Sequence, residues 1–374
     1  MPRLVAIDMP AGPEFVDAVR RVLGDGDAFL PLDGRLDVAD RRRQATDLGA
    51  AVVVTSDGLT SLDAGRPTEV GDAVVIATSG STGTPKGVVL TLESVMSSAR
   101  SGSSALPADD RVHWLACLPL SHVGGLSVVF KAVFGGHALT VHPNFDRDRV
   151  VAAAASGCTH VSLVPTTLRR IDPFVFRCVL LGGSRPPADR PSHVVATYGL
   201  SETGGGVVYD GVPLPGVDIE IADDGEILVR SPMNMRCYRD GSTTIDSLGR
   251  LHTGDIGRMV DGRLHVDGRL DDLIKTGGEK VWPDVVERAI ATRYPDSAVC
   301  VAGIDDPEWG QMVVAATTDP DLTLDLIRGV VKESLPSHCA PKRLVLVERL
   351  PATSIGKVRR GEVAHLVRSS TDDL

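Results

Sequence analysis

The stretch TSGSTGTPKGVVLT, residues 78–91, opens with seven consecutive Gly, Ser or Thr residues and reaches Lys86 after one proline. The apolar run AVVIA precedes it and VVL lies near its end, so a polar loop between two strands is expected. Glycines let a backbone approach an anion closely, and hydroxyls, N–H groups and a lysine supply donors. The stretch therefore predicts a phosphate-binding loop. It is not a Walker A loop, because Pro85 directly precedes Lys86.

Length and composition limit the number of domains and the classes of protein that fit the chain. The 374 residues predict more than one domain, and the net charge of −10 disfavours nonspecific nucleic-acid binding. Charge or glycine breaks the apolar stretches, so no membrane span is expected. The six cysteines form no CxxC pair and indicate neither a zinc site nor a disulfide framework, which favours a cytoplasmic protein.

Hydrophobic periodicity changes twice along the chain. Helical spacing in residues 13–24 and short apolar runs ended by Pro or Gly predict an α/β domain with buried sheets over residues 1–270. Within it, alternating residues and the Asp261-Gly262 hairpin signal predict a β subdomain over 207–268. Residues 271–374 mix helical and strand patterns, including a helix expected over residues 283–293 with Pro283 near its start, and predict a small α+β domain.

Five motifs in order resemble those of the adenylate-forming superfamily of acyl-CoA synthetases, luciferases and adenylation domains. They are TSGSTGTPKG, YGLSETGG (198–205), HTGD (252–255), GRLDDLIKTGGEKV (268–281) and PATSIGKVRR (351–360). The resemblance implies a two-step activation of a small-molecule carboxylic acid, first by ATP and Mg²⁺ and then by coenzyme A. Such chemistry needs preorganised positive charge and donors at the phosphates.

The resemblance also implies roles for individual residues. Glu202 would hold Mg²⁺, since a carboxylate beside phosphates requires an intervening cation. Its alternative is a surface glutamate in a loop. Lys357 would bridge the acid and the α-phosphate during adenylation, although a lone lysine in a polar loop is ordinarily solvated. The expected ATP-binding residues are Thr78, Ser79, Gly80, Ser81, Thr82, Gly83, Thr84, Lys86, Gly183, Ser184, Tyr198, Gly199, Ser201, Asp255 and Arg269.

The segment PLSHVGGLSVVFKAVF predicts the acyl site. His122 would gate it, as the family often has a histidine or aromatic residue there, and a helix is expected to start just after it. Ser127 and Lys131 share one helical face, which would line the acyl pocket with a single cation. The alternative for Lys131 is a side chain that snorkels to water.

The family rotates its small C-terminal domain about a hinge residue, which matches Asp271 here. One pose would bring Lys357 to the active site for adenylation. The other pose would bring the side of the domain that carries Gly277-Gly278 to the same site for the thiol. The short segment before Thr78 suggests a trimmed acyl-pocket wall, which a partner chain in a homodimer could supply.

Segments such as VLLGGS and GGGVVYDGVPLPGV resemble o-succinylbenzoate–CoA ligases of menaquinone biosynthesis. Another aryl or acyl acid–CoA ligase, or a non-catalytic nucleotide-binding protein, are the alternatives.

Overall fold

The computed structural model describes residues 1–78, 86–107, 111–184, 186–187, 189–351 and 358–369. By compactness they form two units. The N-terminal unit comprises residues 1–220, 228–253 and 261–264, and the C-terminal unit comprises residues 221–227, 254–260 and 265–374. The boundary expected at Asp271 stays a prediction.

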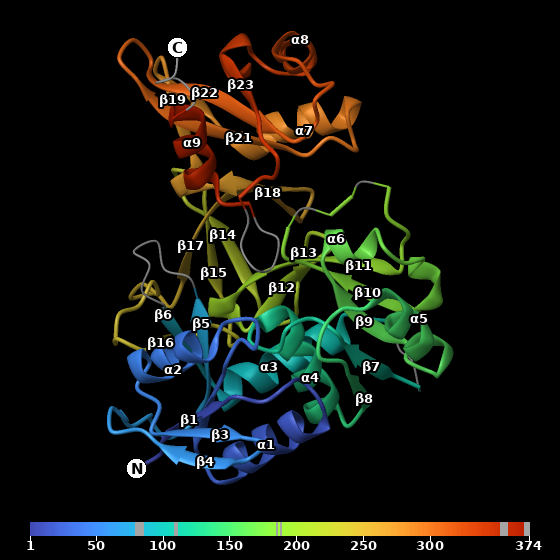
Figure 1. Cartoon of the computed structure of the whole chain (residues 1–374), viewed down its shortest axis with the longest axis vertical. Helices are drawn as coiled ribbons and strands as arrows, with labels where there is room; N and C mark the ends of the chain where they lie inside the picture. Colours follow the sequence, from blue (N-terminus) through green and yellow to red (C-terminus); the bar gives the residue numbers. More distant parts are fainter. Residues whose placement is uncertain (79–85, 108–110, 185, 188, 352–357, 370–374) are drawn as a thin grey trace. The chain divides into compact units, whose positions relative to one another are not determined.

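The N-terminal unit contains two seven-stranded sheets (Figure 1). In the first, β1, β2, β3 and β5 pair in parallel, and β4, β6 and β16 add antiparallel edges. Its order is β16 (Cys237–Tyr238), β6 (Lys86–Thr91), β5 (Asp72–Thr78), β2 (Ala28–Pro31), β1 (Leu4–Ile7), β3 (Val52–Thr55) and β4 (Gly58–Ser61), with helices α1 (Pro13–Gly24) and α2 (Val38–Asp47).

The second sheet has a parallel centre in which β8, β7, β9, β10 and β11 follow one another, and β12 and β13 extend it antiparallel. Its carboxyl ends carry Gly183-Ser184 and the segment after Leu200, the place where open α/β sheets bind ligands. Its strands are β13 (Val212–Pro213), β12 (Gly205–Tyr209), β11 (Val194–Leu200), β10 (Cys178–Leu181), β9 (His160–Leu163), β7 (His113–Ala116) and β8 (Ala138–Val141).

Two helices lie between these sheets. Helix α3 (Leu92–Ser104) packs on α4 (Val123–Gly135) and contacts strands of both sheets, while Phe130 of α4 meets Phe29 of β2 with ring centroids 6.2 Å apart. Thr91 caps α3 by accepting from the Ser94 N–H, and Gly136 ends α4 in the left-handed region. Helix α4 is buried nearly all round, so its polar residues cannot reach bulk water easily. The shorter helices are α5 (Arg147–Ala155), α6 (Pro165–Leu168), η1 (Pro173–Val175) and η2 (Ser201–Thr203).

A four-stranded sheet has residues in both units, in the order β14 (Asp218–Ile221), β15 (Glu226–Arg230), β17 (Leu251–Val260) and β18 (Arg263–Arg269). The turn between β17 and β18 is at Asp261-Gly262, where both φ angles are positive, at 49° and 73°. A hairpin turn with two positive φ angles is what the Asp-Gly pair predicted.

The C-terminal unit packs three helices against a small sheet. Its strands are β20 (Glu279–Val281), β19 (Ile274–Thr276), β22 (Gly310–Thr317), β21 (Val299–Asp306) and β23 (Arg343–Leu346). Its helices are η3 (Leu270–Asp272), α7 (Pro283–Arg293), α8 (Leu324–Ser334), η4 (Ser337–Cys339) and α9 (Arg360–Ser369). Helix α7 matches the expected segment, with Pro283 at its first position. The expected mixed α/β architecture is confirmed.

Arg360, the first residue of α9, is the centre of an ion-pair network in this unit. Its guanidinium donates to Asp272 of η3 at 3.2 Å, to Glu287 of α7 at 3.0 Å and to the Val301 carbonyl at 2.8 Å, and it also pairs with Asp284. One arginine therefore joins η3, α7, β21 and α9.

Candidate active site

The expected phosphate loop is the connection between two paired strands. Thr78 ends β5 and Lys86 begins β6, and the Thr78 hydroxyl donates to the Lys86 carbonyl at 3.1 Å. Residues Ser79, Gly80, Ser81, Thr82, Gly83 and Thr84 lie outside the described residues.

Tyr238 joins Lys86 to Glu202. The Lys86 ammonium lies 5.1 Å from the centroid of the Tyr238 ring, within the range of a cation–π contact. The Tyr238 hydroxyl donates to Glu202 Oε1 at 2.8 Å. The structure thus brings together the lysine and the carboxylate that the sequence assigned to phosphate and metal. Tyr238 itself was not predicted, because CYRDG contains no motif that singles it out.

The Glu202 segment is a tightly built turn. Glu202 lies in η2 after β11, beside Ser201, and the fully buried Thr203 donates to the Gly205 carbonyl at 2.7 Å. Gly199 has no room for a side chain, since a Cβ there would lie 2.0 Å from the Gly205 carbonyl oxygen. Tyr198 precedes this close approach on β11.

A single carboxylate held in this way fits Mg²⁺, which takes one or two protein carboxylates and completes its shell with phosphate oxygens and water. No group of three or more His, Cys, Asp or Glu side chains suited to a metal occurs among the residues described.

The two residues expected at the ribose meet in the C-terminal unit. Asp255 is 7% exposed, and its carboxylate lies 3.2 Å from the Arg269 guanidinium. Asp255 on β17 and Arg269 at the end of β18 therefore form an ion pair.

The hinge and thiol residues also lie in the C-terminal unit. Asp271 is exposed in η3. Gly277 and Gly278 form the turn between β19 and β20 with φ angles of 58° and 85°. A Cβ on Gly277 would lie 2.8 Å from the Trp309 ring, so this turn requires glycine on two grounds. Lys357 lies outside the described residues.

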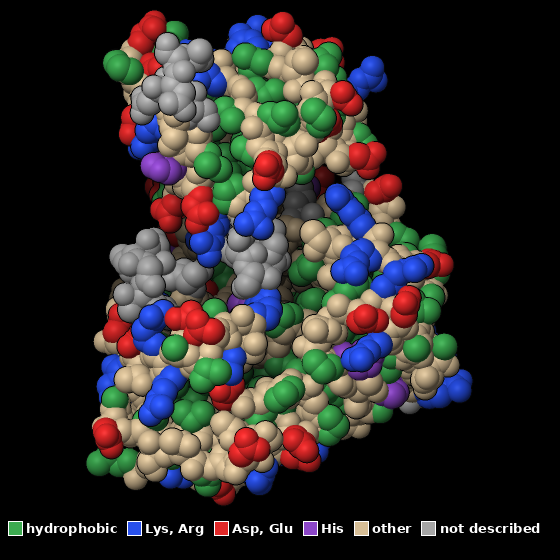
Figure 2. Space-filling view, in the orientation of Figure 1, with side chains coloured by type: hydrophobic (Ala, Val, Ile, Leu, Met, Phe, Trp, Pro, Cys, Tyr) green, Lys and Arg blue, Asp and Glu red, His purple; other side chains and the backbone are tan. Residues whose placement is uncertain are grey.

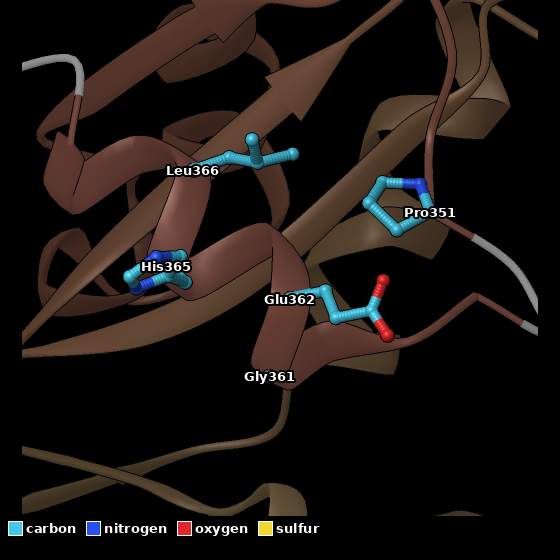
Figure 3. Close-up of a pocket in the computed structure, with 5 residues that line it drawn as sticks. All are labelled: Pro351, Gly361, Glu362, His365 and Leu366. Atoms are coloured by element: carbon cyan, nitrogen blue, oxygen red, sulfur yellow. The ribbon is translucent and has the colours of Figure 1, made fainter.

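A cleft of about 360 Å³ lies at α9 (Figure 3). Its lining residues directly precede or closely follow residues 352–357 in sequence. The lining consists of Pro351, Gly361, Glu362, His365 and Leu366. The lining thus combines two apolar side chains with a glutamate and a histidine.

His122 and Lys131 lie on one helix, α4. His122 is the N-cap residue, as expected, and Lys131 follows nine residues later, which is about 13 Å along the axis at 1.5 Å per residue. The His122 imidazole contacts Arg35, which was not predicted: Nε2 lies 2.8 Å from a guanidinium nitrogen of Arg35. Burial, and next the Arg35 charge, lower the pKa of His122, while Asp33 opposes the shift.

Lys131 is 2% exposed and does not snorkel to bulk water. Among the described residues nothing forms an ion pair or hydrogen bond with it, and burial lowers the pKa of Lys131 to about 8. A Cβ on Gly102 would lie 2.8 Å from the Tyr209 hydroxyl and 3.3 Å from Lys131 Nζ, so both polar atoms converge beside Gly102.

Ser127 is buried one turn before Lys131 on the same face. A Cβ on Gly205 would meet Ser127 and Ser98, at 3.5 Å each, so this face of α4 lies beside the glycine run that follows Glu202.

Comparison with known proteins agrees with this arrangement. The model of the AMP-binding enzyme family matches residues 63–239, and that of the AMP-binding enzyme C-terminal domain matches residues 286–357. A probable 2-succinylbenzoate–CoA ligase of Mycobacterium tuberculosis (strain CDC 1551 / Oshkosh) is 34% identical over 305 residues, which cover 72% of this chain and 79% of the relative. The chain belongs to the adenylate-forming, AMP-binding enzymes. The superfamily resemblance is confirmed.

Other adenylate-forming relatives extend the comparison. The 2-succinylbenzoate–CoA ligase of Bacillus anthracis (strain A0248) is 33% identical, and the match covers 68% of this chain and 61% of that protein. The o-succinylbenzoate CoA synthetase (MenE) of Bacillus subtilis, solved with its acyl-adenylate intermediate OSB-AMP, superposes with a TM-score of 0.85 at 28% identity, covering 96% of this chain and 87% of that one. The same enzyme was solved with ATP and a magnesium ion, with a TM-score of 0.84 at 27% identity, covering 96% and 88% of the two chains.

The sequence predicted no membrane span. In the part of the chain that the structure describes, no helix is long and apolar enough to cross a membrane. On the face shown in Figure 2, acidic and basic side chains of the N-terminal unit are interspersed.

Proposed function

We propose that the protein is an AMP-forming acid–CoA ligase that activates a dicarboxylic aromatic acid, o-succinylbenzoate, through an acyl-adenylate. The observation that carries the substrate is Lys131, a fully buried ammonium with no acidic partner among the described residues. The relatives named above act on 2-succinylbenzoate by their names, and that acid has one carboxylate to activate and one that remains charged.

A buried, unpaired ammonium is costly, because removing a charge from water is compensated only by an opposite charge or several hydrogen bonds. The cost is justified if an anion of the substrate completes the pair. Lys131 would then attract the aromatic carboxylate, with the Tyr209 hydroxyl beside it as a second donor.

The position of Lys131 supports the same assignment. The face of α4 that carries Lys131 lies beside β12, because Ser127 on this face approaches Gly205. Strand β12 directly follows the Glu202 segment. The residues that would bind the acyl end and those that would bind the phosphate end of a ligand therefore lie in the same unit. Ser127 would contact the acyl group between them. An apolar pocket with few polar groups fixes the orientation of such a ligand.

The remaining roles follow the chemistry of acyl-adenylate formation. Residues 78–84 and Lys86 would hold the β- and γ-phosphates, and Glu202 would hold the Mg²⁺ of MgATP. The segments of Gly183-Ser184 and Tyr198–Ser201 would hold the adenine end of the nucleotide. Asp255 and Arg269 would bind the ribose. These groups orient the α-phosphate and stabilise charge during attack by the acid.

Lys357 would stabilise the adenylation step. Rotation of the C-terminal domain at Asp271 would then bring the Gly277-Gly278 turn to coenzyme A for the thiolation step. We further propose that the enzyme acts in the cytoplasm, and a homodimer remains the simplest assembly.

Pyrophosphate release tests the proposal. The wild-type enzyme should release pyrophosphate with o-succinylbenzoate, and Lys131→Ala should raise KM for this acid by about tenfold or more while KM for ATP stays near wild type, since a hydrogen bond to a charged group contributes about 1.5–3 kcal/mol. Lys131→Arg keeps the charge and is the matched control.

A monocarboxylate analogue without the aromatic carboxylate should be indifferent to Lys131→Ala. Normal use of the diacid by this variant would contradict the substrate and favour another acid–CoA ligase. Absence of ATP–pyrophosphate exchange with any acid would favour a non-catalytic nucleotide-binding protein.

A further inference from the structure

Two residues of the N-terminal segment form a hydrogen-bonded pair beside His122. Asp33 and Arg35 follow β2, and the Asp33 carboxylate accepts from Arg35 Nε at 2.8 Å and from Nη2 at 2.6 Å. The same Nη2 lies 2.8 Å from His122 Nε2, across 87 residues of sequence. The guanidinium thus bridges a carboxylate and an imidazole.

The chemistry of this contact fixes the position of the imidazole proton. A guanidinium has five N–H donors and no acceptor, so a nitrogen at hydrogen-bond distance from it must offer a lone pair. His122 Nε2 is therefore unprotonated in this arrangement, and the ring of a neutral imidazole carries its proton on Nδ1. Asp33 Oδ2 lies 3.8 Å from His122 Nε2, beyond hydrogen-bond distance, and does not compete for that nitrogen.

We propose that Asp33 and Arg35 are positioning residues that hold His122 neutral, with its N–H on Nδ1 as a fixed donor to the acyl substrate. No acceptor for this N–H occurs among the residues that the structure describes, and the His122 side chain is one-third exposed, at 33%, so a ligand can reach it. Identification of that ligand as the acyl group rests on the proposed function.

The electrostatics agree with a neutral ring. Burial is the largest cause of the lowered pKa of His122, and Arg35 lowers it further, whereas Asp33 raises it. These two residues, both from the loop after β2, are the charged groups that act on His122 among the described residues. Arg35 also lowers the pKa of Asp33, against the effect of burial, so the carboxylate remains charged.

Hydrogen bonds within the loop after β2 hold Arg35 in position. The Arg35 N–H donates to Asp33 Oδ1 at 3.1 Å and the Leu36 N–H to the Asp33 carbonyl at 3.0 Å, and Arg41 donates to the Leu36 carbonyl at 2.6 Å. These bonds form a closed turn rather than a loose connection. The loop after β2 thus supplies the arginine that contacts His122.

The tautomer is tested directly by long-range ¹H–¹⁵N spectra of the whole enzyme with ¹⁵N-labelled histidine. The chain has ten histidines, and His122→Gln assigns the signal of interest. Wild-type His122 should show an Nδ1–H tautomer and a pKa below the ordinary value of an imidazole. Arg35→Met leaves Asp33 beside the ring and should raise the pKa of His122 by about one unit or more, whereas Arg35→Lys should preserve the tautomer.

The matched control lies at the other end of the same strand. Asp27 precedes β2 and pairs with Arg3 through two hydrogen bonds of 2.9 and 3.1 Å, so Arg3→Met removes a similar arginine–aspartate fork without approaching His122. This control should leave the tautomer, the pKa and kcat/KM of the enzyme unchanged.

The pH dependence of kcat/KM distinguishes a positioning role of Arg35 from a general loss of folding. At pH 8, Arg35→Met frees Nε2 to carry the proton, and kcat/KM for the acid should fall about tenfold for one lost hydrogen bond. At a pH below the raised pKa of His122 in this variant, the protonated ring again has an Nδ1–H, so the deficit relative to wild type should shrink there.

The outcomes are distinguishable. An Nε2–H tautomer in the wild type, or a deficit that is the same at both pH values, overturns the inference. Absence of ligase activity in the wild type overturns the proposed function instead, while the spectra still decide the tautomer.

Discussion

Replacing Lys131 by methionine should stabilise the free enzyme. Burial holds the pKa of Lys131 at about 8, against an ordinary value of 10.5. The unfolded chain therefore binds this proton more tightly than the folded one, which costs stability. From 1.36 kcal/mol per pKa unit, the cost is about 3 kcal/mol at pH 7.

The sign of the effect sets its pH window. The cost is fully present below pH 8, shrinks as pH rises from 8 to 10.5, and vanishes above 10.5, where both states have a neutral amine. Methionine keeps the unbranched shape but is one atom shorter, which costs about 1 kcal/mol in lost packing. Lys131→Met should therefore raise the free energy of unfolding by about 2 kcal/mol at pH 7, and this gain should be lost near pH 10.

Urea unfolding at pH 7 and pH 10 measures this difference, with fluorescence of Trp114 as a probe because it is buried in the second sheet at 1% exposure. Lys332→Met removes an exposed lysine of α8 and is the control, for which no pH-dependent gain is expected. If Lys131→Met destabilises the protein at pH 7, or if its gain is the same at both pH values, then Lys131 is not an unpaired buried cation. The same variant should lose affinity for the diacid, so the residue trades stability for binding.

Three further predictions concern the catalytic cycle. Tyr238→Phe keeps the ring beside Lys86 but removes the hydrogen bond to Glu202, so kcat should fall about tenfold and more Mg²⁺ should be needed for half-maximal pyrophosphate exchange; an unchanged Mg²⁺ requirement would contradict its role. Lys357→Ala should nearly abolish acyl-adenylate formation and spare thiolation of supplied acyl-adenylate, and equal losses in the two half-reactions would refute the assignment. Asp271→Pro fixes φ and removes an N–H, so one half-reaction should survive better than the other; wild-type rates in both would show that Asp271 is not the hinge.

Local patterns predicted the elements well because their causes are local. Helix α7 begins at Pro283, α4 begins directly after His122, and the turn at Asp261-Gly262 has the two positive φ angles that its residue types allow. Phosphate, metal and ribose candidates were likewise found from residues that stand together in short motifs.

Contacts between distant segments could not be predicted in this way. Tyr238 reaches Glu202 across 36 residues because β16 pairs antiparallel with β6. The residues CYRDG contain no hydrophobic periodicity from which this pairing could be predicted. Arg35 reaches His122 across 87 residues for a similar reason, since the loop after β2 and the start of α4 meet only in the folded unit. That Lys131 has no counter-ion among the described residues is also a property of packing: the helical face was predicted, but the burial was not.

The network around Arg360 limits how this enzyme can be recombined with its relatives. Arg360 follows the segment of Lys357 by three residues, and its guanidinium is shared by acids of the hinge segment and of α7. A chimera that exchanged α9 alone, with a different residue at position 360, would leave Asp272, Asp284 and Glu287 as neighbouring charges without their common cation. Residues 271–374 should therefore be transplantable as one block, whereas a crossover between α7 and α9 that changes the residue at position 360 should yield a poorly folded chain.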